Sequence, residues 1–71
     1  MWTLVIDNLT TGAMEEQQGS YEFLAPQFAD EVAAGLRLGW QATSSTQEAD
    51  CYSVTFEAED FTLVVTLATQ E

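Results

Sequence analysis

Carboxylates are the side chains in this sequence whose number and spacing could support chemistry. The 71 residues include 12 Asp and Glu, one Lys or Arg and no His, which gives a formal net charge of −11 at pH 7. Closely spaced carboxylates can act as a general acid and base, bind hard cations, or attract a basic partner. The residues around them decide which of these roles the sequence favours.

A catalytic site is not predicted. The absence of histidine rules out Ser–His and Cys–His pairs. Cys51 is the only cysteine, and no basic residue beside it would activate its thiol. The carboxylates fall on polar loops and on the solvent faces of predicted strands rather than in a cleft. We therefore expect no enzymatic activity.

Metal and cofactor sites are not predicted either. Zinc sites need a Cys/His ligand set that this sequence lacks. The segments 48–50 and 57–60 supply carboxylate oxygens, but neither has the D-x-D-x-D-G spacing of a calcium loop. We expect no cofactor and no dedicated metal ion.

The charge balance also excludes classes of partner. Binding to nucleic acid or to anionic lipid depends on Lys and Arg, and Arg37 is the only such residue. No apolar run approaches the roughly 20 residues that span a bilayer. The segment 1–7 lacks the basic start of a signal peptide, and a single cysteine fits a reducing compartment. We therefore expect a cytoplasmic protein that contacts neither nucleic acid nor membrane directly.

The apolar content predicts a folded chain in spite of the charge. Hydrophobic residues make up 46% of the sequence and aromatic residues 11%, whereas disordered acidic chains are poor in both. A chain of this length holds one core, so we expect a single domain over residues 1–71. Period-two alternation of apolar and polar residues predicts strands at 2–9, 40–45, 51–58 and 61–68.

The last two predicted strands pass a register test. Pairing them around Glu59 and Asp60 places each inward apolar residue opposite another inward apolar residue, as a hairpin with one buried face requires. The pairs are Ala58 with Phe61, Phe56 with Leu63, and Val54 with Val65.

One helix is predicted between these strands. Phe28, Val32 and Leu36 recur every fourth residue and form one apolar stripe. Pro26 suits the first helical position, and Gly39 is placed to end the helix at about residue 38.

Other residues refine this helix. Asp30 and Glu31 are expected near the positive end of its dipole. Gly35 weakens it by about 1 kcal/mol relative to Ala, which close packing on a sheet would explain.

The polar residues 13–20 are interpreted as a loop or weak edge strand that runs into 21–24. The predicted fold is α+β with the order β(β)αβββ: one antiparallel sheet of three to five strands, covered on one face by a single helix.

The density of negative charge favours a DNA-mimic hypothesis. A domain of this length has a radius of gyration of about 11 Å and hence a diameter near 29 Å, and duplex DNA of that length carries about 17 phosphates. Twelve carboxylates on such a body approach the charge of the duplex. Glu57 and Glu59, two apart on an extended strand, would project on the same side about 6.6 Å apart.

Such a display would enter the basic groove of a nucleic-acid-binding protein. Asp30 and Glu31 are expected on the other side of the sheet, away from the contact. The candidate partner-binding carboxylates are Asp7, Glu15, Glu16, Glu22, Glu48, Asp50, Glu57, Glu59 and Asp60.

Other interpretations of the acidity stay open. An acidic surface can keep a small protein soluble, and proteins of halophiles tolerate charge repulsion. A generic acidic interaction domain, or an immunity- or antitoxin-type binder of a basic protein, would have the same composition. Val5 and Val64 fall on the outward side of their strands, so a homodimer that covers them is an additional possibility.

The chain resembles the small phage-encoded anti-defence proteins. The resemblance rests on the acidic, lysine-free composition, the size, and the order of one helix among antiparallel strands over the whole chain. This group includes DNA mimics among anti-CRISPR, anti-restriction and uracil-glycosylase inhibitor proteins, with inhibitors of bacterial CRISPR surveillance complexes the most similar. It implies a non-enzymatic inhibitor that acts in the cytoplasm of a host bacterium. No motif aligns, so no functional residue is carried over.

Overall fold

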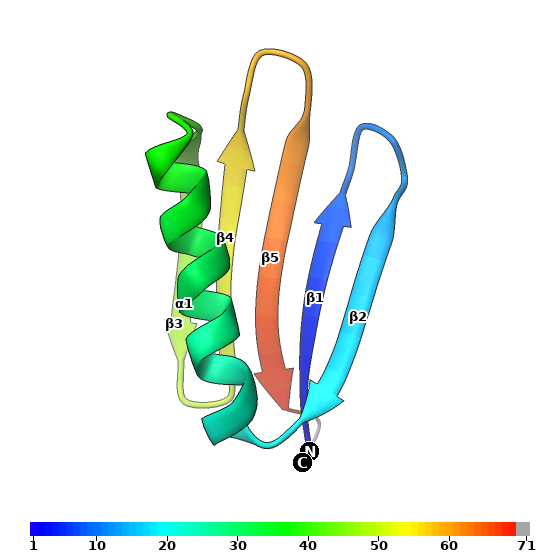
Figure 1. Cartoon of the computed structure of the whole chain (residues 1–71), viewed down its shortest axis with the longest axis vertical. Helices are drawn as coiled ribbons and strands as arrows, with labels where there is room; N and C mark the ends of the chain where they lie inside the picture. The colour runs from blue at the N-terminus through cyan, green and yellow to red at the C-terminus, as the bar shows by residue number, and fades with distance from the viewer. Residues whose placement is uncertain (70–71) are drawn as a thin grey trace.

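One helix packs on one face of an antiparallel sheet, as the alternation of the sequence predicts. The computed structural model describes residues 1–69, whose strands follow the order β2-β1-β5-β4-β3 across the sheet. The α+β prediction is confirmed, and residues 14–19, for which a loop and a strand were both open, form a strand. The elements are β1 (Trp2–Asn8), β2 (Met14–Gly19), α1 (Tyr21–Arg37), β3 (Gln41–Glu48), β4 (Cys51–Glu57) and β5 (Thr62–Thr69) (Figure 1).

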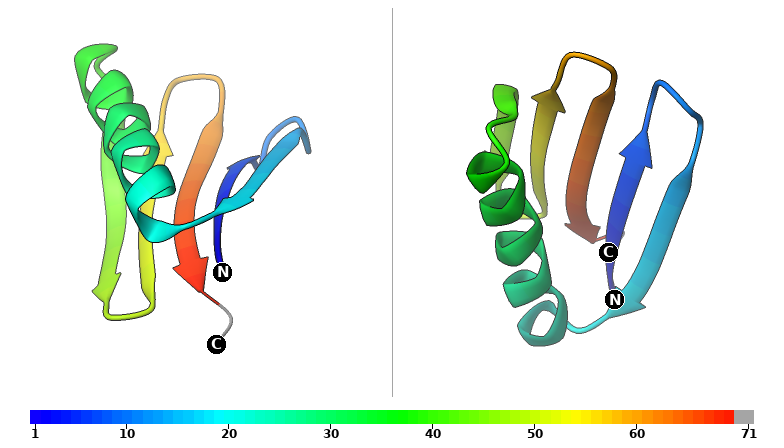
Figure 2. Two further views of the ribbon diagram at one scale, coloured as in Figure 1. Left: turned by 60° about the horizontal axis from the view of Figure 1, so that its bottom comes forward. Right: turned by 45° about the horizontal axis from the view of Figure 1, so that its top comes forward.

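The helix connects the two edge strands and crosses the sheet obliquely. It starts beside the end of β2 and finishes beside the start of β3, so the turn between β1 and β2 stands apart from it (Figures 1 and 2). The described body measures 35 × 22 × 18 Å, with a radius of gyration of 11.7 Å, close to the expected 11 Å.

The core lies where the helix meets the central strands. Apolar residues at alternate positions of β1, β4 and β5 point toward α1, and α1 contributes one fully buried leucine. The β4–β5 register is the predicted one, and the Ala58 N–H donates to the carbonyl of Phe61 at 2.9 Å. The buried side chains are Leu4, Leu24, Phe56, Val65 and Leu67.

The helix begins five residues before the predicted start. Ser20 is the N-cap, and its hydroxyl accepts a hydrogen bond from the N–H of Phe23 at 3.2 Å. Pro26 therefore lies inside the helix, where it removes one hydrogen bond to an exposed carbonyl near the N-terminus. The interpretation of 21–24 as a continuation of a loop or weak edge strand is wrong, because a capped first turn holds these residues in a helix.

This earlier start moves the helix acids. Glu22 is the acid in the first turn, where the dipole favours a negative charge. Asp30 and Glu31 lie in the middle of the helix, so their predicted place at its positive end is wrong.

The helix ends as predicted. Gly39 has φ +86°, the N–H of Trp40 donates to the carbonyl of Gly35 at 3.1 Å, and the N–H of Gly39 donates to that of Leu36 at 3.1 Å. A Cβ on Gly35 would lie 3.0 Å from Phe56 Cζ, which confirms close packing on the sheet. The inward stripe therefore passes through Gly35, and Leu36, expected in the stripe, is 57% exposed.

Candidate functional site

The strand register sorts the carboxylates between the two faces of the sheet. Residues opposite each other in antiparallel strands share a face, and successive residues alternate. Leu4 and Ile6 belong to the face packed on α1, so Val5 and its cross-strand partners belong to the uncovered face, here called the open face. Four candidate acids lie on the open face by this register: Asp7, Glu16, Glu48 and Glu57.

Three of these acids follow a diagonal across the open face. Glu16 pairs with Val5, two residues from Asp7, which places these two acids about 8 Å apart at usual strand spacings. Asp7 pairs with Val64, and Glu57 lies across from Thr62, about 12 Å from Asp7 by the same spacings. We call Glu16, Asp7 and Glu57 the acidic diagonal.

The turn between β4 and β5 extends this diagonal. Glu59 and Asp60 form the tip of this turn, at the same end of the sheet as the turn between β1 and β2 (Figure 1). β4 ends at Glu57, so Glu59 belongs to the turn. The expectation that Glu57 and Glu59 share one strand is therefore wrong.

A second group of acids lies at the opposite end of the molecule. Glu48 ends β3, Asp50 follows it in the turn to β4, and Glu22 sits in the first turn of α1. All three are exposed. The candidate carboxylates therefore divide between two ends and do not form one continuous track.

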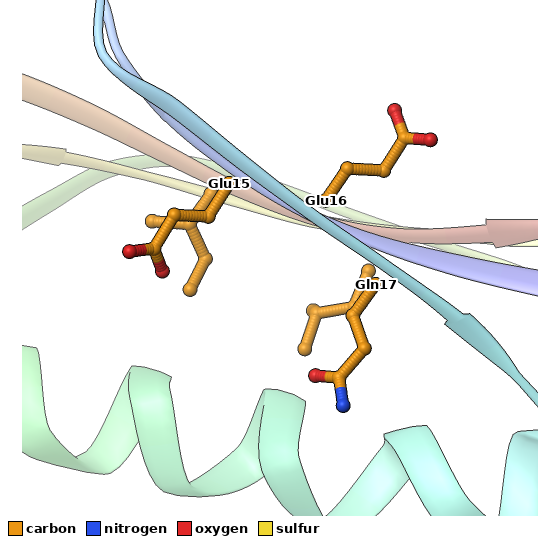
Figure 3. A pocket seen from close by; sticks show the side chains of 5 residues that line it. Glu15, Glu16 and Gln17 are labelled. Atoms are coloured by element: carbon orange, nitrogen blue, oxygen red, sulfur yellow. The ribbon is translucent and has the colours of Figure 1, made fainter.

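Glu15 belongs to neither group, because it faces the helix. Glu15 and Gln17 point from β2 toward α1, whereas Glu16 points to the other side (Figure 3). A hollow of about 370 Å³ lies there, with Leu4 and Ile6 as its apolar walls and Glu15, Glu16 and Gln17 at its border.

A second hollow continues the first along β2. It has a volume of about 410 Å³ and shares Ile6 and Glu15 with the first. Glu31 of α1 lines it, so a carboxylate from the helix and one from β2 border the same space. Glu31 lies with α1 on the side of the sheet opposite the open face, and Glu15 is a candidate acid that shares this side. We call the two hollows together the β2–α1 groove, lined among others by Leu4, Ile6, Glu15, Gln17, Glu31 and Leu63.

Sequence reasoning missed this groove for a definable reason. The face that Glu15 occupies depends on the pairing of β2 with β1, where it lies opposite Ile6. The segment is too polar to show a buried face, so only the tight turn before it indicates that β2 pairs with β1. In that turn Asn8 Oδ1 accepts from the N–H groups of Thr10 and Thr11, and Gly12 has φ +79°.

The remaining polar chemistry is limited. Within residues 1–69 no group of three or more His, Cys, Asp or Glu is arranged to hold a metal ion, and no polar side chain there is buried. The pKa of Tyr52 is raised above its usual value. The largest cause is repulsion from the Tyr21 phenolate, followed by a side-chain hydrogen bond with Tyr21 and, last, by burial. α1 is too short and too polar to cross a membrane.

Comparison of this chain with known protein families, with curated proteins and with solved structures finds no match.

Proposed function

We propose that this protein binds the basic nucleic-acid-binding surface of another protein and occupies it in place of DNA. The observation that carries the proposal is the acidic diagonal on a rigid strand scaffold, continued by the turn acids Glu59 and Asp60. A sheet holds such charges at fixed spacings, so little conformational entropy is lost when a partner binds them. The net charge of −11 adds long-range attraction that speeds encounter with a basic groove.

The cost of this charge supports a role in binding. Repulsion among like charges destabilises a compact chain, and a domain of this size has a thin margin of stability. The resemblance to phage anti-defence proteins favours a bacterial CRISPR surveillance complex as the partner, in the cytoplasm of the host cell. A solubilising acidic coat is the rival explanation, and it predicts that the position of each carboxylate is unimportant.

Charge reversal at matched positions tests the proposal. The partner is first captured from a bacterial lysate on the immobilised protein and released with duplex DNA, which selects proteins bound through their nucleic-acid sites. Its affinity is then measured for two variants that change the net charge equally. The first reverses Asp7, Glu16, Glu57 and Asp60, and the second reverses Glu22, Asp30, Glu48 and Asp50.

The two variants have different expected outcomes. The first should lose about 3 kcal/mol or more of binding free energy, because it removes charges that meet the partner directly. The second should lose much less and should also lower helix stability through Glu22. Equal losses would mean that only the total charge matters, and the DNA-mimic proposal would then be wrong.

A salt series separates the proposal from halophilic adaptation. We expect cooperative thermal unfolding in ordinary buffer and a partner affinity that falls steeply as ionic strength rises. A chain that folds only in molar salt would instead be a halophilic protein. An affinity that does not change with salt would contradict the electrostatic account.

A further inference from the structure

Both edges of the sheet are open within the described chain, and they differ in charge. β2 pairs only with β1, and β3 pairs only with β4. An edge strand presents unpaired N–H and C=O groups to which another extended chain can add. Every residue from Met14 to Gln18 is exposed, as is every residue of β3.

The outward backbone groups of β2 can be assigned from the ladder. The N–H of Asn8 donates to the carbonyl of Ala13 at 2.8 Å, and inward and outward groups alternate along an antiparallel strand. Glu15 and Gln17 therefore bond to β1, and the backbone groups of Glu16 and Gln18 face outward. The free edge thus runs beside a pair of adjacent glutamates, one on each face of the sheet.

We infer that the free edge of β2 accepts an extended basic segment of the partner as an additional strand, with its cationic side chains beside Glu15 and Glu16. This inference rests on the proposed function, because it names the partner's contacting element. Alternate residues of such a strand would point to opposite faces. Those on one face meet Glu16, and those on the other meet Glu15 and the β2–α1 groove.

The groove is lined by the kinds of residue that a long cationic side chain can contact. Arg and Lys bury their aliphatic stems on apolar surface while the charged head stays near water and carboxylates. Ile6 provides the apolar surface, and Glu15 and Glu31 border the same space from two elements. A guanidinium between these two carboxylates would form charge-assisted hydrogen bonds that a neutral side chain cannot form.

Charge complementarity favours a basic occupant over a second copy of this chain. Pairing of β2 with β2 from another copy would bring their glutamates together, and like charges across strands are destabilising. The β3 edge is a weaker candidate, because its register shifts between Ala42 and Ser44 and such bulges interrupt strand addition. Its sequence, QATSSTQE, carries one acid.

The test uses two synthetic peptides that repeat the sequence Arg-Arg-Thr-Thr, so that an extended peptide carries arginine on both faces. They are identical except that one carries N-methyl groups on all of its backbone amides, so it keeps the charge but cannot pair with a strand along either edge. The unmethylated peptide should bind about tenfold more tightly, because each backbone hydrogen bond contributes roughly a few-fold in affinity. Equal affinity of the two peptides, or no binding of either, would overturn the inference.

A matched pair of proline variants locates the contact. Gln18→Pro removes one outward N–H from β2, and Gln47→Pro removes one from β3, because Gln47 lies across from Tyr52, whose backbone groups bond to β5. Gln18→Pro should weaken the unmethylated peptide about fivefold, and Gln47→Pro should leave its affinity unchanged. Equal effects would contradict addition at β2. If Gln18→Pro does not fold, the comparison of the two peptides on the unchanged protein decides.

A charge-matched pair tests the groove. Glu31→Gln and Glu48→Gln remove the same charge, but only Glu31 borders the groove. We expect Glu31→Gln to weaken the peptide about threefold and Glu48→Gln to have little effect. If these comparisons fail but DNA still displaces the captured partner, only the strand addition is wrong. If DNA does not displace the partner but the unmethylated peptide still binds more tightly than the methylated one, the proposed function is wrong instead.

Discussion

The two halves of the sheet use their residues differently. In the β4–β5 half, Phe56, Val65 and Leu67 are at most 1% exposed. In the β1–β2 half, Leu4 is buried, but residues 14–18 are all exposed and the helix stands apart from the turn between the strands. One half therefore provides most of the buried apolar surface, and the other leaves an edge and a groove open to a partner.

The two acids of β2 show how charge can be kept away from the core. Glu15 and Glu16 occupy an exposed edge strand, where water screens their repulsion and little packing depends on them. The central strand β5 carries no charged residue. A small domain can keep an unfavourable net charge when the charged residues lie away from the side chains that stabilise it.

The largest expected effect on the free energy of unfolding comes from a substitution in the core. Phe56→Ala should lower the free energy of unfolding by about 4 kcal/mol, because it leaves a cavity under α1. Ile6→Ala in the other half should lower it by about 1–2 kcal/mol, because Ile6 is only partly buried. Urea denaturation of both variants gives the two values. Similar losses would show that the two halves share the core equally.

Two glycines offer a smaller and better-matched comparison. A Cβ on Gly35 would lie 3.0 Å from Phe56, and one on Gly19 would lie 3.0 Å from Phe23. Phe56 is fully buried, whereas Phe23 is 55% exposed and can turn aside. Gly35→Ala should therefore cost about 1–2 kcal/mol in spite of the better helix propensity of alanine.

Gly19→Ala is the control for this comparison. It should change the stability by less than about 0.5 kcal/mol, because its new methyl group meets a movable ring on the surface. Thermal melts measure both variants. A stabilised Gly35→Ala variant would show that α1 can move away from the sheet at little cost.

The sequence predicts the covered half better than the open half. Tyr52, Val54 and Phe56 alternate with polar residues along β4, so burial fixes the register and the sequence predicts the hairpin pair by pair. Residues 14–19 are polar on both faces, and a strand without a buried face gives no periodic signal. Their pairing with β1 is visible only in the folded chain.

The helix start and the groove escaped prediction for related reasons. Pro26 is a strong signal for a helix start and outweighs the weaker cap signal of Ser20 in the sequence. Because the helix begins at Tyr21, its acids move by more than a turn. That shift, together with the register of β2, places Glu31 and Glu15 at the border of the same hollow. The roles of the nine candidate carboxylates in partner binding stay predictions.

Removing charge from the open half should produce a small gain in stability. Glu15→Gln combined with Glu16→Gln should raise the free energy of unfolding by a few tenths of a kcal/mol at low salt, by relieving repulsion. Neutralising Glu48 and Asp50 at the opposite end is the control and should give a similar gain. Both gains should vanish at high ionic strength. A loss of stability in the first variant would mean that these glutamates make contacts that hold β2 in place.

The smallest expected effect concerns the aromatic cluster that joins the two halves near the start of α1. Trp2 of β1 lies 5.0 Å from Tyr21 and 6.3 Å from Tyr52 of β4, measured between ring centroids.

Tyr21 raises the pKa of Tyr52, so the folded state favours the neutral phenol. The stabilisation is therefore complete below the usual tyrosine pKa of about 10 and is lost as the pH rises through the higher folded value. The free energy of unfolding should decline over this alkaline range. Tyr21→Phe should reduce the decline, because it removes the charge and the hydrogen bond that raise the folded pKa of Tyr52, and Tyr52→Phe should remove the contribution of this phenol. A decline that Tyr21→Phe leaves in place would mean that burial, and not the neighbouring phenol, controls the ionisation that links the two halves.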